Sequence, residues 1–314
     1  MLRTNSLLIL TASLAATAAF AQEEGTTFKI DSRLVVLHAS VLDKGGKLLT
    51  DLPQKNFKVL ENNIEQQIRL FRREDVPVSL CIVIDDSGSM RDKRAKVAAA
   101  ALNLVKASNK NDEVCIVNFN DDAYLDQPFT NSVQKLEQAL EKIESRGGTA
   151  MRDAVGMSID YLKKDGKKDK KVVLIITDGD DTASTETLEK LVAKCQRSEV
   201  LVYSIGMLTE EEARRAKTAK RNLSMLAKES GGMAFFPKDL VEVESLAIQI
   251  ANEIRNQYII TYIPTNQQLD GSYRTIKVVA TGKGSPVVRT RSGYFATAEA
   301  KATSPKAANK VSQK

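Results

Sequence analysis

The chain has 314 residues, of which 42% are hydrophobic and 27% are charged, and its formal net charge is +6. This length and balance are typical of a soluble globular protein with one large domain and a small companion. The charge does not indicate a nucleic-acid-binding face, because Arg3 and the lysines of the last stretch, 296–314, account for most of the excess and the other charges are interspersed.

Residues 1–21 have the features of a secretory signal peptide. Arg3 precedes an apolar run over Leu7–Phe20, and Ala19-Phe20-Ala21 matches an A-x-A cleavage site. The alternative, an N-terminal membrane anchor, is disfavoured because the run is short for a membrane span. No later stretch is long and apolar enough to cross a bilayer. We therefore expect an exported protein, periplasmic or secreted, without a transmembrane segment after cleavage.

The segments 22–73 and 258–296, on either side of the middle of the chain, predict β structure. In the first, every second residue is apolar at Val35, Leu37, Ala39 and Val41. In the second, Asp270-Gly271 is a turn signal between two apolar runs. Neither segment has enough core to fold alone, so we expect both to pair into one small antiparallel β module. The basic tail, 297–314, is rich in Ala, Ser and Lys and is expected to be disordered.

The middle segment, 74–257, alternates short apolar runs with helical patterns. The runs are Val78–Ile84, Val114–Phe119, Val172–Ile176, Val200–Ile205 and Met233–Phe236. Nearly continuous apolarity marks strands that are covered on both faces, as in a parallel sheet. We therefore predict an α/β domain with a doubly wound, mostly parallel six-stranded sheet. One helix is expected to open at Thr209, with Glu212 completing a capping box.

The cysteines and the single histidine give no catalytic signal. Cys81 and Cys115 lie in apolar strands and Cys195 lies on the apolar face of a helix, so we expect three buried thiols. A Cys81–Cys115 bridge is the alternative, since export favours disulfides. It would join neighbouring parallel strands, where the geometry is usually strained. His38 is expected at the surface.

Three polar segments follow or adjoin predicted strands, and they carry the candidate chemistry. They are Asp85-Asp86-Ser87-Gly88-Ser89, Gly147-Gly148-Thr149 and Thr177-Asp178. In a doubly wound sheet, ligands bind outside the carboxyl ends of the strands. Carboxylates and hydroxyls offer only oxygen, which is the donor set for Mg²⁺, Mn²⁺ or Ca²⁺. Each segment alone could simply cap a helix, but the coincidence of all three at one sheet edge favours a metal site.

In this order, Asp85-x-Ser87-x-Ser89, Thr149 and Asp178 resemble the metal-ion-dependent adhesion site of von Willebrand factor A-type domains. Over Phe28–Ala296 the chain is similar to a bacterial exported group of such proteins. The resemblance implies a von Willebrand factor A-type domain over 74–257. It also implies that the two serine hydroxyls bind the metal directly and Thr149 directly or through water, while Asp85 and Asp178 act through water or hydrogen bonds.

The resemblance also implies that the metal takes an Asp or Glu carboxylate from a partner protein. Asp86, Met90 and Arg91, with the loop Asn118–Tyr124, are expected to rim this face and select the partner. We therefore expect a binding protein that mediates adhesion or assembly in the cell envelope.

Two other functions are compatible with parts of this sequence. The first is a scaffold whose metal site is vestigial. The second is a metal-dependent hydrolase with Asp85 as nucleophile, but haloacid dehalogenase-like phosphatases need an acid at the position where Ser87 stands. The sequence also has no P-loop and no G-x-S-x-G elbow. We therefore do not expect an enzyme.

Overall fold

The structure is a computed structural model that describes residues 34–141, 145–208 and 213–297. The predicted signal peptide, the Thr209/Glu212 capping box and the tail beyond Thr297 lie outside the described residues. The described residues belong to one contact unit that begins at Arg33. Within that part of the chain, no helix combines the length and apolarity that a membrane span requires.

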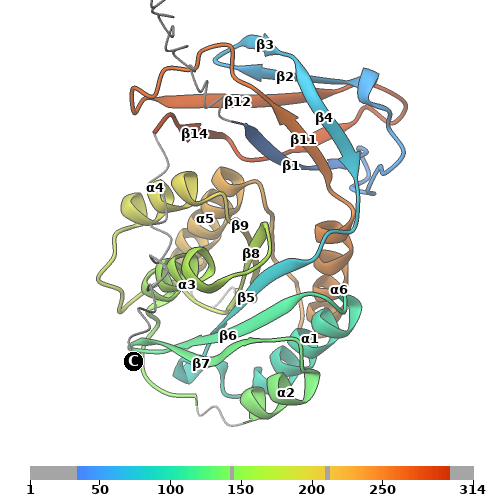
Figure 1. Ribbon diagram of the computed structural model, residues 1–314. Coiled ribbons are helices and arrows are strands. Elements are labelled where there is room, and N and C mark those ends of the chain that lie inside the picture. Colours follow the sequence, from blue (N-terminus) through green and yellow to red (C-terminus); the bar gives the residue numbers. More distant parts are fainter. Residues whose placement is uncertain (1–33, 142–144, 209–212, 298–314) are drawn as a thin grey trace, which may run out of the picture. The chain divides into compact units, whose positions relative to one another are not determined.

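A six-stranded sheet forms the centre of the middle segment, in the order β10-β9-β8-β5-β6-β7 (Figure 1). Five strands are parallel, and only β7 runs antiparallel to its neighbour β6. The bounds are β5 (Val78–Asp85), β6 (Glu113–Phe119), β7 (Ala123–Thr130), β8 (Lys170–Thr177), β9 (Leu201–Gly206) and β10 (Ala234–Phe235). The predicted doubly wound, mostly parallel six-stranded sheet is confirmed.

Within the described residues, six helices cover the two faces of this sheet (Figure 1). One face carries α1 (Arg94–Ala107), α2 (Val133–Glu141) and α6 (Val241–Arg255). The other carries α3 (Met151–Asp165), α4 (Leu188–Ser198) and α5 (Ala213–Ser230). On β5, Leu80 and Ile82 pack into the first core, whereas Cys81 and Val83 pack into the second. This alternation along a strand buried on both faces explains why its sequence reads as one continuous apolar run.

The edge strand β7 was not predicted from the sequence. Its residues, Ala123–Thr130, are only partly buried or exposed, and they include Pro128. Because an edge strand pairs on one side only, it tolerates a proline and shows little apolar periodicity. Consequently the expected loop Asn118–Tyr124 shrinks to a tight turn at 120–122 between β6 and β7.

The strands of the two flanking segments form two four-stranded sheets, ordered β13-β1-β11-β4 and β14-β12-β2-β3. Their bounds are β1 (Val35–Leu42), β2 (Phe57–Glu61), β3 (Ile64–Gln66), β4 (Ile68–Arg73), β11 (Tyr258–Tyr262), β12 (Tyr273–Ala280), β13 (Val287–Arg289) and β14 (Gly293–Phe295). Each sheet contains strands from both segments, and they pair directly in β1–β11 and β2–β12. Apolar residues of the two sheets share one core, which includes Val35, Ile260, Val59 and Val278.

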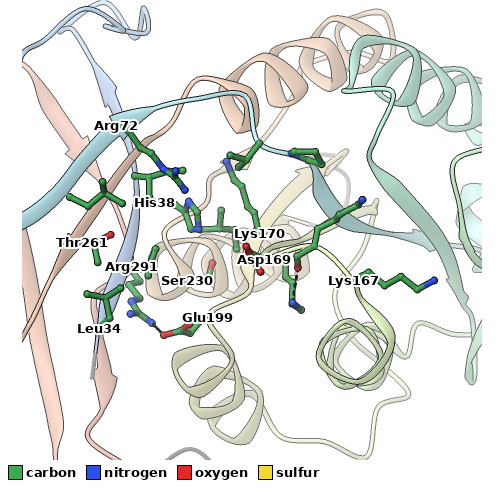
Figure 2. Close-up of a pocket in the computed structure, with 18 residues that line it drawn as sticks. Leu34, His38, Arg72, Lys167, Asp169, Lys170, Glu199, Ser230, Thr261 and Arg291 are labelled. Carbon is green, nitrogen blue, oxygen red and sulfur yellow. Dashed lines mark hydrogen bonds and ion pairs between the residues drawn. The ribbon is translucent and has the colours of Figure 1, made fainter. Parts of the chain in front are cut away.

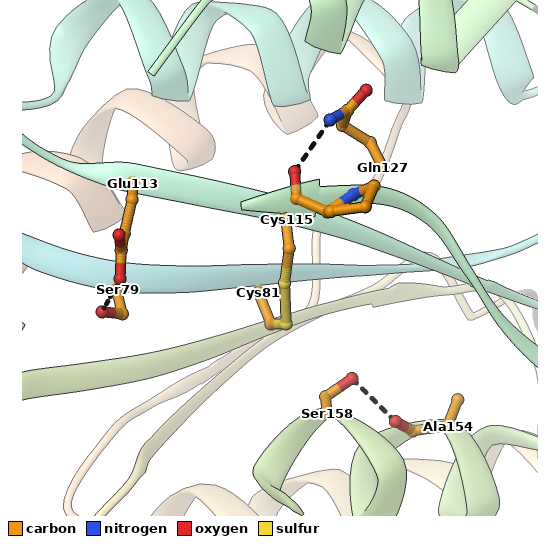
Figure 3. The surroundings of a disulfide bond; sticks show 8 residues. Ser79, Cys81, Glu113, Cys115, Gln127, Ala154 and Ser158 are labelled. Atoms are coloured by element: carbon orange, nitrogen blue, oxygen red, sulfur yellow. Dashed lines mark hydrogen bonds between the residues drawn. A yellow bond between two sulfur atoms is a disulfide. The ribbon is translucent and has the colours of Figure 1, made fainter. Parts of the chain in front are cut away.

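Cys81 and Cys115 form a disulfide, so the expectation of three buried thiols was wrong for this pair (Figure 3). The two residues are register partners in the parallel ladder between β5 and β6, and their Cα atoms lie 4.8 Å apart. That separation is within the range that a disulfide spans. Cys195 keeps its thiol and is buried on α4, where burial raises the pKa of the thiol to about 12.

The carboxylate of Glu253, which is 1% exposed, connects the helical domain to the strands of both chain ends. On one side Tyr203 of β9 donates a hydrogen bond to it over 3.1 Å. On the other side Ser40 of β1 donates to it over 2.9 Å, and Arg289 of β13 forms an ion pair over 2.9 Å. Gln257 donates to the hydroxyls of both Ser40 and Tyr203. Each partner of this buried carboxylate therefore comes from an element other than α6.

We predict that Glu253→Ala lowers the free energy of unfolding by about 3–5 kcal/mol, because it leaves the Arg289 charge and two hydroxyls without their acceptor. The matched control is Glu244→Ala on the same helix, whose partly exposed ion pair with Lys96 spans 3.7 Å. The control is expected to lose less than about 1 kcal/mol. Urea unfolding followed by circular dichroism measures both, and equal losses would contradict the role given to Glu253.

Candidate functional site

Three loops meet at the carboxyl edge of the central sheet. The first follows β5 and contains a short 3-10 helix, η2 (Gly88–Met90). Backbone hydrogen bonds tie it to the loop before α3, from Arg146 to Asp86 over 2.9 Å and from Gly88 to Gly147 over 3.3 Å. The third loop, after β8, is joined to the second by a bond of 2.9 Å from the Thr182 N–H to the Thr149 carbonyl. The parallel sheet thus brings together segments that lie far apart in the sequence.

Asp85, the last residue of β5, is held at this edge by hydrogen bonds to both of its carboxylate oxygens. Its carboxylate accepts the Ser87 N–H over 2.9 Å and the Thr177 hydroxyl over 2.5 Å. The residue is 2% exposed. Burial raises the pKa of Asp85 to about 6, although these hydrogen bonds oppose the shift. The bonds fix the direction of the loop that carries the serines.

The hydroxyls of Ser87 and Ser89 in this loop connect to the carboxylate of Asp178. The Ser87 and Ser89 Oγ atoms lie 3.1 Å apart, and Ser89 donates to Asp178 Oδ1 over 2.9 Å. Asp85, Ser87, Ser89 and Asp178 therefore gather as the sequence predicted. Thr149 lies at the same edge, 7% exposed, and its N–H donates to the Thr182 hydroxyl over 3.1 Å.

Lys93 is a member of this cluster that the sequence reasoning missed. Its ammonium pairs with Asp178 Oδ2, and the side chains of Lys93 and Asp178 are 20% and 2% exposed. Lys93 directly precedes α1, and η2 with the turn after it returns the chain to the carboxyl edge of the sheet. The available signal was a lysine four residues after Ser89, about one helical turn away. Its contact shows that Asp178 attracts a positive charge at this position.

Two of the three residues expected at the rim are buried. Asp86 is 2% exposed and accepts hydrogen bonds from Ser145 over 3.0 Å and Tyr124 over 3.2 Å. Its backbone N–H donates to the Phe119 carbonyl, so its side chain lies in the loop interface, where burial raises the pKa of Asp86. Met90 is 1% exposed because it packs into the core below α1. Only Arg91 is exposed as expected.

Further carboxylates hold the surrounding loops in shape. Asp121 accepts the Gly148 N–H over 2.7 Å. Gly147 has φ +73°, and a Cβ there would come within 2.2 Å of the Asp121 carboxylate, so this position requires glycine. Asp181 accepts both the backbone N–H of Arg152, over 2.7 Å, and its guanidinium, over 3.0 Å. These contacts keep the three loops in a fixed relation before any ligand binds.

The donor set of this edge fits a hard divalent cation. Asp85 and Asp178 supply two carboxylates, and Ser87, Ser89 and Thr149 supply neutral hydroxyls. Among the described residues, no three His, Cys, Asp or Glu side chains come together as a metal cluster. A cation at this edge would therefore depend on the hydroxyls. An all-oxygen set of this kind suits Mg²⁺, Mn²⁺ or Ca²⁺ and not zinc or copper.

The donor residues of this edge lie in a segment that matches a known protein domain. Residues 80–180 match the model of the von Willebrand factor type A domain. The uncharacterized protein sll0103 of Synechocystis is 30% identical over 137 residues, which are 42% of this chain and 32% of that protein. Bovine inter-alpha-trypsin inhibitor heavy chain H4 is 23% identical over 68% of this chain and 24% of its own length. This chain thus spans less than a third of these relatives.

Several solved structures have a similar fold. The von Willebrand factor domain of the type V pili tip protein Mfa5 from Porphyromonas gingivalis is 13% identical, with a TM-score of 0.49 over 57% of this chain and 95% of that one. The von Willebrand factor type A protein from Catenulispora acidiphila is 14% identical, with a TM-score of 0.47 over 83% and 73%.

Proposed function

We propose that this chain, in which residues 80–180 match the model of the von Willebrand factor type A domain, binds a divalent cation and, through it, a partner protein. Asp85, Ser87, Ser89, Thr149 and Asp178 hold the cation, which is Mg²⁺ or alternatively Mn²⁺ or Ca²⁺. The partner supplies an Asp or Glu carboxylate. The protein is exported, and it serves adhesion or assembly in the cell envelope.

The continuous set of oxygens from Ser87 through Ser89 to Asp178 carries this proposal. Two carboxylates offset the charge of one divalent cation, and the hydroxyls add none. A cation held in this way keeps affinity for one further anionic oxygen, which is the chemistry it supplies to recognition. The exposed guanidinium of Arg91 stands beside the same loop and favours an acidic partner.

The similarity of this segment to integrin alpha-11 supports a binding role over a catalytic one. The human protein is 37% identical over 81 residues, although these are only 7% of its length. The arrangement of Asp85 also argues against a nucleophile. Both of its oxygens accept hydrogen bonds, from Ser87 and Thr177, and its side chain has almost no exposed surface.

We predict one cation site by calorimetry with Mg²⁺, Mn²⁺ and Ca²⁺. The double variant Ser87→Ala/Ser89→Ala is expected to lose measurable binding, since two hydroxyl ligands disappear while Asp85 keeps its structural contacts. Ser245→Ala is the matched control, because that serine is exposed on α6 and bonds only to the Glu242 carbonyl over 2.8 Å. A double variant that titrates like the parent would show that the cation is held elsewhere.

Lys93→Gln is expected to raise the affinity for Mg²⁺ about tenfold at neutral pH. The ammonium of Lys93 occupies one oxygen of Asp178 and therefore competes with the cation for the same charge. The control is Lys96→Gln, three residues further along in the first turn of α1, where the ammonium pairs with Glu244. Unchanged affinity in Lys93→Gln would mean that its ion pair does not compete.

Thr149→Ala is expected to weaken capture of the partner from envelope extract at least about tenfold while the melting temperature stays close to that of the parent. Thr149 lies in a loop whose shape depends on its backbone bonds with Thr182, so the hydroxyl can be removed without disturbing them. Thr149→Ser, which keeps a hydroxyl, should retain binding. If capture survives both Thr149→Ala and excess chelator, the chain is a scaffold with a vestigial metal site.

A further inference from the structure

A cavity lies at the amino edge of the central sheet, opposite the proposed cation site, where β5, β8 and β9 begin (Figure 2). Its volume is about 650 Å³. One wall is formed by β1, β11 and β4, and the other by the loops that lead into the parallel strands, including Val76-Pro77 and the stretch Lys167–Lys171. A volume of this size is typical of small-molecule sites.

The wall on β1, β11 and β4 is one face of that sheet. Its alternate residues, such as Leu37 and Ile260, point into the core shared by the two smaller sheets. The side chains on the opposite face line the cavity in two register rows, Val36–Thr261–Leu70 and His38–Ile259–Arg72. Half of these six side chains are apolar, and the polar ones include a histidine and an arginine in the same row. Leu70 is 43% exposed, so part of the apolar surface is open to solvent.

Basic side chains line both sides of the cavity, with Arg72 on the sheet wall and the four lysines of 167–171 on the opposite one. Among the described residues that line the cavity, six are lysine or arginine and only two, Asp169 and Glu199, are acidic. Glu199 is already paired with Arg291 over 2.9 Å (Figure 2). Figure 2 shows Arg72, His38 and Lys170 around the same space. An excess of positive charge inside a cavity with apolar walls attracts an anion more strongly than the same charges on an open surface.

Two buried polar atoms in this cavity have no hydrogen-bond partner, Nδ1 of His38 and Nε of Arg291. His38 is partly exposed, although its Nδ1 atom is buried, so the imidazole is less open to solvent than the surface position expected for it. Burial, followed by the charges of Lys170 and Arg291, lowers the pKa of His38 well below its usual range. Burial also lowers the pKa of Lys170 to about 7. The shift of His38 reflects positive neighbours, whereas that of Lys170 reflects burial alone, since the nearby carboxylates of Asp75, Asp112 and Glu253 act to raise its pKa. Buried polar atoms without partners are uncommon in native proteins.

We propose that this cavity binds a small organic anion with an apolar body and a carboxylate or phosphate head. The head lies among His38, Arg72 and the lysines of 167–171, and the body lies against Val36, Leu70 and Ile259. Such an anion would supply hydrogen-bond acceptors to the basic side chains and would also cover the apolar side chains. Inorganic phosphate can do only the first, and an uncharged long-chain alcohol mainly the second. The proposal is independent of the cation site, which lies at the other end of the same strands.

Calorimetry on the intact chain with decanoate, decyl phosphate, decanol and inorganic phosphate tests this assignment. At least one of the two alkyl anions is expected to bind at a single site, at least about tenfold more tightly than decanol and inorganic phosphate. The tighter of decanoate and decyl phosphate identifies the head group. Excess chelator is expected to leave this binding unchanged, which separates it from the cation site. Equal binding of decanol, or no binding of either alkyl anion, overturns the proposal.

Arg72→Gln and Lys171→Gln are each expected to weaken binding of the alkyl anion about tenfold. The matched control is Arg69→Gln, which removes the same charge from an exposed position of β4 that does not line the cavity. Leu70→Asn should weaken binding of the alkyl anion without affecting inorganic phosphate. Melting temperatures confirm that each variant is folded. If both Arg72→Gln and Lys171→Gln bind like the parent, the cavity is not the site.

Discussion

The buried carboxylate of Glu253 is the contact on which the arrangement of the described chain depends. It accepts hydrogen bonds from Ser40 and Tyr203 and pairs with Arg289. One charge thereby joins α6 and β9 of the domain to β1 and β13, which come from opposite ends of the sequence. A buried carboxylate is costly unless all of its partners are in place. This cost favours the single arrangement in which strands from both ends meet the domain together.

The parallel sheet separates two chemically opposite regions, because its strands all begin at one edge and end at the other. The carboxyl edge gathers the oxygens of Asp85, Ser89 and Asp178, and the loops around it are held by further carboxylates. The amino edge gathers the lysines of 167–171 below the face of β1, β11 and β4. The two proposed sites therefore attract opposite charges, a cation at one end and an anion at the other.

Continuous apolar runs located the strands of the parallel sheet, because strands buried on both faces carry hardly any polar residues. The same criterion failed for β7, whose edge position leaves its residues partly exposed. The D-x-S-x-S segment pointed to the carboxyl edge correctly, since loop positions after parallel strands follow from strand order. The sequence did not predict Lys93 as part of this site, because its ion pair with Asp178 joins residues that only the folded sheet brings together.

Local pattern by itself determined the fold class, the strand–helix alternation and the grouping of Asp85, Ser87, Ser89 and Asp178 at one edge. The tertiary structure decided whether the residues beside this motif are buried or exposed. Asp86 and Met90 are polar and apolar neighbours of the same motif, yet both turn inward, because backbone pairing with β6 and packing under α1 direct them there. Register alone placed Cys81 opposite Cys115, and the elements around β1 bury the Nδ1 atom of His38. Sequence spacing records which residues follow one another, whereas burial and pairing depend on the elements that pack against them.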